Sequence, residues 1–382
     1  MEIASPERHS LVRELAQGLH IDPGDPAKSL QTICLASDAA PFSGIIATDD
    51  AVVELAARAA EQLGLRFNSI DSARLSSRKD LARSQLENAA VPVPRHRLIS
   101  LTENLPGQIH GFSFPCVVKP LNLSASKGVV RVNNLQEFVG ACERIRPLVS
   151  YQTDPFVSRH LLVETYIDGF EVALEGFLTN GKLTVLALFD KPDPLVGPFF
   201  EETYYITPSR LQPEFQRLIE ERVAAACRAY GLMEGPVHAE LRITSDEAWI
   251  LEVAGRTIGG ECGHIFDLAL NQSLEGLAIA NAVGLPLPEV RMAGAAGVLM
   301  IPIPRSGMLK RFEGVEEAKR VPCIEEVRIS ARVGHELVTL PEGSSYLGFI
   351  YCRAETAQQA EMALREAHRK LSFRIDPVWH IS

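Results

Sequence analysis

Two glutamates are spaced so that a β-hairpin would bring their carboxylates together. Residues 236–260 contain a run of alternating apolar and polar residues, a turn signal centred on Asp246, and a second apolar run. Because Asp246 is midway between Glu240 and Glu252, a hairpin folded there sets the two carboxylates opposite each other. Bare carboxylates that close would repel, and a divalent cation that accepts both removes the conflict. All-oxygen ligands favour Mg²⁺ or Mn²⁺, with phosphate oxygens completing the shell.

Arg256 follows the second glutamate and is close in sequence to Gly259 and Gly260. A fixed cation such as Arg256, placed beside a metal and flexible glycines, is suited to stabilise negative charge that develops during a reaction. The alternative is that two strand carboxylates simply face solvent, which is common. Arg256, the paired glycines and two lysine segments upstream favour the functional interpretation.

Two upstream lysines have positions that fit the binding of an anion. Lys79 comes near the start of a predicted helix, where a solvated lysine is the alternative interpretation. Lys119 ends an apolar strand, where a lysine rarely lacks a partner. The residues up to Gly128 are mostly small or polar, and they include Ser124, Ser126 and Lys127. Such a hairpin tip can offer N–H groups and hydroxyls to phosphates, although an ordinary hairpin fits as well, and the Walker A pattern is missing.

The elements that position these residues are predicted from periodicity and from turn signals such as Asn180-Gly181. Strand–helix alternation near the N-terminus suggests a parallel sheet. The helices are predicted for residues 11–19, 51–63, 77–89, 134–145, 211–230, 267–283 and 356–370. The strands are predicted for residues 43–48, 114–120, 129–132, 161–167, 170–177, 183–189, 297–302, 321–330 and 348–354.

A long loop predicted for residues 191–209 is rich in proline and aromatic residues, and long loops on a scaffold often contact substrates. Glu202 is a candidate to meet a substrate ammonium, and an exposed acidic loop is the alternative. His264, which follows the glycine pair, is a candidate at the border of the substrate site. His238 is interpreted as a structural neighbour of Glu240.

Composition excludes several classes of protein. The 382 residues are too many for one ordinary domain, and 46% hydrophobic with 23% charged residues is typical of a soluble globular chain. A net charge of −10 without a basic cluster argues against nucleic acid as the main partner. No apolar run is long enough for a membrane span, and no signal peptide is visible, so a cytoplasmic location is expected. Seven scattered cysteines suggest buried small hydrophobes in a reducing compartment.

The ordered set of Lys79, Lys119 with its loop, VETYIDGFE and HAE…WILEVAGRTIGG resembles the ATP-grasp superfamily over roughly residues 40–375. EVAGR…GG and the C-terminal part look most like the L-amino acid ligases, which are carboxylate–amine ligases that join two amino acids. The resemblance implies a mixed α/β and α+β fold with ATP between two antiparallel sheets. It implies the following parts: a preATP-grasp α/β domain (1–75), an ATP-grasp domain (76–290) with a small lid (about 110–163), and a C-terminal α+β subdomain (291–382). The first part is short for a doubly wound domain, which leaves room for a missing strand and helix.

The resemblance also assigns roles residue by residue. The residues implied for ATP are Lys79, Lys119, Ser124, Ser126, Lys127, Gly128, Glu164, Thr165, Tyr166, Ile167 and Glu171. Among them, Glu164 to Ile167 match the adenine hinge and Glu171 matches the carboxylate that takes the ribose hydroxyls. Glu240 and Glu252 match the Mg²⁺ ligands, and Arg256 matches the arginine that steadies the acyl phosphate. The residues predicted to border the substrates are Glu202, Arg256, Gly259, Gly260 and His264.

One position departs from the superfamily pattern. Many members have Asn two residues after the second glutamate, where this chain has Ala254, so a third protein ligand for metal is missing. Amino acid ligases often resemble this sequence here, and the departure therefore agrees with that subfamily.

The sequence predicts an ATP-dependent ligase that forms a dipeptide through an acyl phosphate, with Lys119 and Arg256 as catalytic residues. Its partners would be small molecules, without nucleic acid or membrane, in a homodimer suggested by the resemblance. Three alternatives stay open: a ligase of the same mechanism with another acid or amine, a nucleotide-binding protein without ligase activity, and an interaction scaffold that binds no nucleotide.

Overall fold

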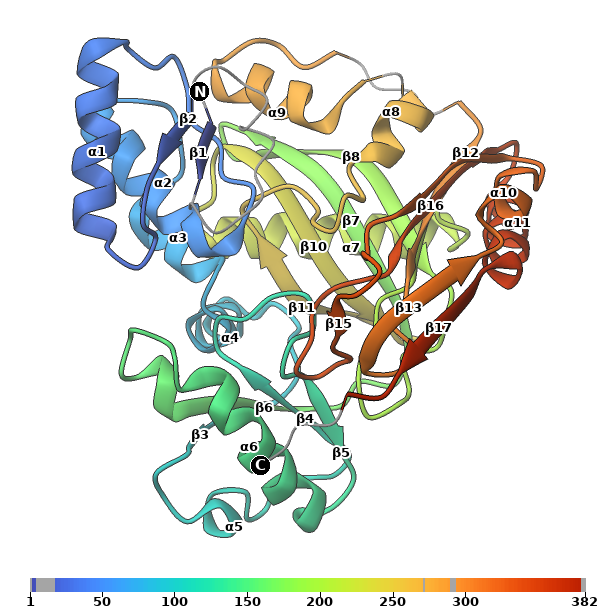
Figure 1. Ribbon diagram of the computed structural model, residues 1–382. Coiled ribbons are helices and arrows are strands. Elements are labelled where there is room, and N and C mark those ends of the chain that lie inside the picture. Colours follow the sequence, from blue (N-terminus) through green and yellow to red (C-terminus); the bar gives the residue numbers. More distant parts are fainter. Residues whose placement is uncertain (1, 5–17, 271, 289–292, 379–382) are drawn as a thin grey trace.

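The computed structural model describes residues 2–4, 18–270, 272–288 and 293–378. Figure 1 shows a central sheet, a small N-terminal part at its upper left, a small α/β unit below it, and the C-terminal elements at its right. The helices are α1 (Pro26–Ala39), α2 (Asp50–Leu63), α3 (Ile70–Leu75), α4 (Lys79–Asn88), α5 (Leu105–Gln108), α6 (Leu135–Val149), α7 (Pro213–Tyr230), α8 (His264–Leu270), α9 (Leu274–Ala282), α10 (Val315–Lys319) and α11 (Ala357–Lys370).

The strands form four sheets. They are β1 (Glu2–Ala4), β2 (Gly18–His20), β3 (His96–Ser100), β4 (Cys116–Pro120), β5 (Val130–Val132), β6 (His160–Thr165), β7 (Phe170–Thr179), β8 (Lys182–Lys191), β9 (Tyr204–Thr207), β10 (Gly235–Ile243), β11 (Ala248–Ala254), β12 (Ala295–Ile301), β13 (Gly307–Glu313), β14 (Ile324–Ile329), β15 (Glu336–Leu337), β16 (Gly348–Ala354) and β17 (Ser372–Asp376).

The largest sheet has eight strands in the order β11-β10-β7-β8-β9-β12-β16-β14. Each strand in this order pairs with its neighbours in the antiparallel direction. Its strands are apolar on both faces because both faces are covered. Val172 and Leu174 of β7 pack in a core with the apolar side of α7, whereas Ala173 and Phe177 pack in another with α8 and α9. Alternate residues of one strand therefore belong to different cores, as the two-residue period of a strand requires.

A separate four-stranded sheet, β3-β6-β4-β5, lies below the large one and packs against α6 through a core of its own. The apolar residues of α6 recur at helical spacing, and Asn134 caps the helix by accepting a hydrogen bond from the backbone N–H of Glu137. The two sheets are joined in sequence between β6 and β7. Residues of both sheets line the cavity described below.

Much of the predicted secondary structure is confirmed. The hairpins β4–β5, β7–β8 and β10–β11 form as predicted, and so do α2, α4, α6, α7 and α11. Helix α2 ends where Gly64 adopts the left-handed conformation, with φ of 64°. The division into residues 1–75, 76–290 and 291–382 stays a proposal. The large sheet runs across the second boundary, since β12, β14 and β16 continue it.

Four predictions about elements are wrong in whole or in part. Residues 43–48 are described without a strand. Of the helix predicted for residues 11–19, residues 11–17 lie outside the described residues, and the last two belong to β2. The helix predicted for residues 267–283 is divided into α8 and α9, because Ser273 caps a new helix. The loop predicted for residues 191–209 contains β9, which pairs with β8 and β12.

Two further findings concern membranes and cysteines. Within the described ranges, we find no helix with the length and apolar character that a membrane crossing requires. All seven cysteines are free, and five of them are buried, which confirms their interpretation as small core residues.

Candidate active site

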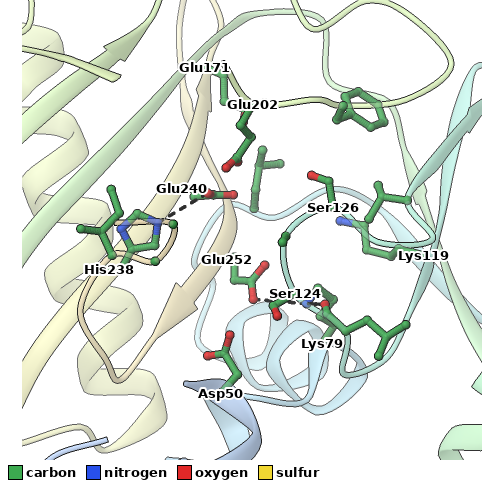
Figure 2. A pocket seen from close by; sticks show the side chains of 18 of the residues that line it. Asp50, Lys79, Lys119, Ser124, Ser126, Glu171, Glu202, His238, Glu240 and Glu252 are labelled. Carbon is green, nitrogen blue, oxygen red and sulfur yellow. Dashed lines mark hydrogen bonds and ion pairs between the residues drawn. The ribbon is translucent and has the colours of Figure 1, made fainter. Parts of the chain in front are cut away.

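The predicted hairpin places Glu240 and Glu252 as direct cross-strand partners in β10 and β11. Both side chains line a cavity of about 320 Å³ between the large sheet and the four-stranded sheet. Figure 2 shows the carboxylates of Glu202, Glu240, Glu252 and Asp50 in a row that faces Lys119 and the loop with Ser124 and Ser126. One wall of the cavity is therefore acidic, and the opposite wall carries lysines and hydroxyls.

The lysine wall is built from a strand end and a helix start. Lys119, near the end of β4, donates to Glu164 of β6 at 2.6 Å. Arg83 lies one helical turn after Lys79 on α4 and donates to the same carboxylate at 2.5 Å. Lys79 itself donates to Glu252 at 3.2 Å and to the carbonyl of Leu123 at 2.9 Å. Two cations thus share one buried carboxylate, so this region has surplus positive charge.

The charge state of Glu164 follows from these contacts. Burial alone would raise its pKa, but the attraction of Arg83 and Lys119 outweighs burial and lowers the pKa to about 2. The carboxylate is therefore ionised at neutral pH. It holds the Lys119 ammonium at the cavity wall.

The acidic wall has the opposite balance. Lys191 ends β8 and is almost fully buried, and its ammonium donates to Glu171 at 3.0 Å, to Glu202 at 2.6 Å and to Glu240 at 3.1 Å. One oxygen from each of these three carboxylates lies within 4.8 Å of the others, which is the spacing of a potential metal site. Arg242 adds a second contact to Glu171, at 3.0 Å.

The pKa values of the acidic wall differ from their ordinary ranges. Burial and the neighbouring Glu240 raise the pKa of Glu202 to about 7, although Lys191 opposes this shift. Burial alone would lower the pKa of His238, but its contacts with Glu175 at 3.1 Å and Glu240 at 3.5 Å raise it to about 9. His238 is therefore a buried neighbour of Glu240, as its sequence position indicated.

Arg256 lines the cavity and joins the large-sheet side to the N-terminal part. Its guanidinium forms a bidentate pair with Asp50, the first residue of α2, at 2.9 and 2.6 Å. Burial opposes the charge, yet Asp50 raises the pKa of Arg256. A planar guanidinium held in this way keeps a fixed direction, which suits the recognition of a carboxylate or a phosphate.

The loop after β4 is a turn rather than an extended tip. Ala125, Ser126 and Gly128 have positive φ angles of 52°, 54° and 73°, and Lys127 N–H donates to the carbonyl of Ser124 at 3.2 Å. A Cβ atom at Gly128 would come within 2.7 Å of the Pro120 ring, so only glycine fits. Ser124 and Ser126 line the cavity, whereas Lys127 and Gly128 lie outside its lining.

The residues predicted for the adenine and the ribose line the same cavity: Glu164, Thr165, Tyr166 and Ile167 for the adenine, and Glu171 for the ribose. The backbone N–H groups of Thr165 and Tyr166 already donate to the carbonyls of Arg95 and Pro115. The Tyr166 ring is held between the guanidinium groups of Arg131 and Arg242, at 4.1 and 4.9 Å from its centroid.

Of the predicted substrate residues, Glu202, Arg256, Gly259 and Gly260 line the cavity. His264 lies outside the lining and pairs instead with Asp267 at 2.8 Å and Glu326 at 3.4 Å. Sequence reasoning missed five residues at the site: Asp50, Arg83, Glu175, Lys191 and Arg242. Lys191 could have been found, because it ends an apolar strand just as Lys119 does. Asp50 could not, since its partner Arg256 lies 206 residues away in sequence.

The donor set fits a divalent cation at Glu240 and Glu252. Both side chains reach the cavity with exposures of 20% and 26%, and each is paired with a lysine, Glu240 with Lys191 and Glu252 with Lys79. Carboxylates that remain partly exposed in the cavity can accept a hard cation together with phosphate oxygens.

Comparison with known proteins relates this site to a family. Residues 112–265 match the model described as an ATP-grasp domain, and residues 299–376 match the L-amino acid ligase C-terminal domain 2. Residues 112–265 of the chain therefore carry an ATP-grasp domain. The crystal structure of an L-amino acid ligase from Bacillus licheniformis superposes with a TM-score of 0.84 at 27% identity, covering 94% of this chain and 88% of that one. The two ATP-grasp sheets that enclose the cavity are those of the superfamily fold.

Curated relatives of this ATP-grasp protein include two kinds of enzyme. The alanine–anticapsin ligase of Bacillus subtilis is 27% identical over 220 residues, 53% of this chain and 46% of that protein. The formate-dependent phosphoribosylglycinamide formyltransferase of Nitratidesulfovibrio vulgaris is also 27% identical, over 68% of this chain and 63% of that protein. The chain spans about half the length of the alanine–anticapsin ligases that it matches.

Proposed function

We propose that this ATP-grasp protein is an ATP-dependent ligase that joins two amino acids and releases ADP and phosphate. The observation that carries the proposal is one cavity in which a paired-carboxylate hairpin faces two lysines and a fixed arginine. The resemblance of both matched regions to amino acid ligases supports amino acids as the substrates.

The proposed reaction has two steps. A carboxylate oxygen of the first amino acid attacks the γ-phosphorus of ATP, and the bond to the bridging oxygen breaks, which yields an acyl phosphate and ADP. The amine of the second amino acid then attacks the acyl carbon. Phosphate leaves with the oxygen that came from the carboxylate, and the amine gives up a proton.

In this proposal, Lys79 and Lys119 bind the phosphate oxygens, and Glu164 with Arg83 keeps Lys119 in place. Mg²⁺, or Mn²⁺, held by Glu240 and Glu252 would neutralise charge on the transferring group. Arg256, oriented by Asp50, stabilises the charge that develops on the acyl phosphate and on the tetrahedral intermediate. Glu171 and the 164–167 hinge take the ribose and the adenine.

Water has to be kept from the acyl phosphate. The small α/β unit that contains β4 and α6 contacts the C-terminal part at two points. Gly128 N–H, in the loop after β4, donates to the Pro341 carbonyl at 2.9 Å, and Arg144 of α6 pairs with Glu342. We propose that this α/β unit acts as the lid of the site and opens when these contacts break.

Three alternatives are kept. The first is a ligase of the same mechanism that acts on another acid or amine, which the similarity to a formyltransferase supports. A nucleotide-binding protein without ligase activity would bind Mg²⁺-ATP and release no phosphate. A scaffold would bind no nucleotide. The homodimer and the cytoplasmic location stay predictions.

Phosphate release from Mg²⁺-ATP, measured against a matrix of paired amino acids with mass spectrometry of the products, tests the proposal. Release that needs a pair and yields a conjugate lighter than its parts by one water supports the ligase. Silence across the matrix contradicts amino acid ligation. Calorimetry with Mg²⁺-ATP then separates a ligase with other substrates, or an inactive binder, from a scaffold.

A further inference from the structure

Lys191 occupies a position that a metal ion would suit. It is the last residue of β8, its cross-strand partner is Glu171 of β7, and its side chain is 3% exposed. The ammonium lies within 3.1 Å of a carboxylate oxygen from each of Glu171, Glu202 and Glu240. These residues come from β7, from the segment before β9 and from β10, so separate parts of the chain converge on one nitrogen.

The surrounding groups leave this ammonium as the shared cation of the cluster. Arg242 contacts only the Glu171 carboxylate among the three, and His238 contacts only Glu240. The hydroxyl of Tyr205 donates to Glu202 at 2.8 Å, and the Tyr205 ring lies 4.9 Å from the ammonium. Arg242 and His238 therefore each make an ionic contact with one of the three carboxylates, whereas Lys191 contacts all three.

Three carboxylates that each place an oxygen within 4.8 Å of the others, one of them buried and two partly exposed, favour a cation between them. A divalent ion would meet this need, because carboxylate oxygens are its preferred ligands. The tethered ammonium meets it without any metal in solution. Lys191, His238 and Tyr205 all contact Oε1 of Glu240, which fixes the orientation of that carboxylate.

We propose that Lys191 is a positioning residue whose ammonium takes the place of a divalent cation among Glu171, Glu202 and Glu240. Because the ammonium occupies that cluster, a metal ion binds only on the side of the cavity where Glu240 faces Glu252. The second half of this statement rests on the proposed function, because it takes Glu240 and Glu252 as metal ligands. The first half concerns the chain alone.

The test is a titration of the full chain with Mn²⁺, without nucleotide or amino acids. The electron paramagnetic resonance signal of free Mn²⁺ measures how many ions are bound. We expect Lys191→Gln to bind one Mn²⁺ more than the unchanged protein does, at Glu171, Glu202 and Glu240. The affinity of this cluster for Mn²⁺ should rise more than about tenfold, since the competing ammonium charge is gone. Lys191→Arg, which keeps a cation, should gain no ion. Lys182→Gln removes an exposed lysine from the same strand and serves as the matched control.

A stability measurement separates positioning from ordinary packing. Lys191→Gln should melt at a lower temperature than the unchanged protein, and Mn²⁺ should restore most of the difference, because the ion replaces the lost ammonium. A packing defect would not respond to metal. Adding Glu202→Gln to Lys191→Gln should abolish both the additional ion and the recovery, since one of the three ligands is gone.

Several outcomes would overturn the proposal. Lys191→Gln that binds Mn²⁺ like the unchanged protein contradicts it, and so does a melting deficit that Mn²⁺ leaves in place. A variant that fails to fold both with and without Mn²⁺ contradicts it as well. None of these measurements uses ATP turnover, so their failure would leave the ligase proposal standing, and an inactive protein that gains the ion would still support the role of Lys191.

Discussion

Two buried lysines at strand ends, Lys119 of β4 and Lys191 of β8, have environments of opposite charge balance. Lys119 shares the single carboxylate of Glu164 with Arg83. Lys191 is shared by the carboxylates of Glu171, Glu202 and Glu240. The same side chain thus shares one carboxylate with a second cation on one wall of the cavity and lies among three carboxylates on the other.

The difference shows how one cavity can bind both the negative phosphate groups and the positive metal ion of a metal–nucleotide complex. A wall with surplus cations attracts phosphate oxygens, and a wall with surplus carboxylates attracts a hard cation. Figure 2 shows these walls facing each other, with Glu252 and Lys79 joined where they meet. The predictions below change first the acidic wall, then the lysine wall, and last a contact outside both walls.

The largest effect is expected from Glu252→Gln on the acidic wall. Replacing the carboxylate by an amide weakens the cation site where charge develops, and we expect turnover to fall by about a thousandfold. Steady-state phosphate release measures it. Asp246→Asn, which removes an exposed carboxylate from the turn of the same hairpin, is the control and should keep full turnover. Equal turnover in Glu252→Gln would contradict the metal-ligand assignment.

The next effect concerns the stability of the lysine wall. Glu164→Gln leaves Lys119 and Arg83 buried with no carboxylate between them, which should lower the free energy of unfolding by about 3 kcal/mol. Urea denaturation at neutral pH measures this change. A loss no larger than that of an exposed pair would show that the wall does not depend on Glu164.

The same residue gives a pH dependence with a definite sign. The pKa of Glu164 is about 2 in the folded protein against an ordinary value of 4.5, so the unfolded chain takes up its proton at higher pH. Its contribution to stability is complete above pH 4.5 and is lost as the pH falls toward 2. Urea denaturation at stepped pH should show a shallower acid loss for Glu164→Gln, and parallel curves would contradict this.

A smaller effect is expected for Lys119→Met. Removing one charge-assisted contact to phosphate should lower turnover by about a hundredfold and raise the KM for ATP, while the binding of Mn²⁺ alone stays unchanged. Lys310→Met, at an exposed strand lysine, is the matched control. Loss of Mn²⁺ binding in Lys119→Met would mean that the two walls are not separate in function.

The smallest effect is expected at the contact that holds the proposed lid to the C-terminal part. Arg144 and Glu342 are 47% and 37% exposed, so Arg144→Ala should change the free energy of unfolding by less than about 1 kcal/mol. If lid opening limits turnover, the same variant should raise the rate of product release in stopped-flow measurements. A large loss of stability would show that the lid is part of the fixed structure.

Features that depend on residues close together in the sequence could be predicted from it. The pairing of Glu240 with Glu252 followed from alternation and a turn midway between them, and the structure confirms it. Lys119 was found because a charge at the end of an apolar strand needs a partner. The same rule applied to Lys191 would have found it, but the proline-rich segment after it was interpreted as loop from Lys191 onward.

The remaining features depend on contacts between distant segments. The Asp50–Arg256 pair and the Arg83–Glu164 pair join residues 206 and 81 positions apart, and no periodicity reports such pairs. Strand β9 is short and follows a segment rich in proline and aromatic residues, so it forms only because β8 and β12 flank it. The break between α8 and α9 depends on the Ser273 cap, which a continuous apolar pattern hides.

The most direct test of the central claim uses the amino acid pair that releases the most phosphate. The amino acid that supplies the carboxylate is labelled with ¹⁸O in that group, and the released phosphate is analysed by mass spectrometry. The account predicts that one labelled oxygen moves from the carboxylate to the phosphate, because the acyl phosphate is cleaved at its acyl carbon. Unlabelled phosphate, released together with a conjugate, would contradict the proposed mechanism.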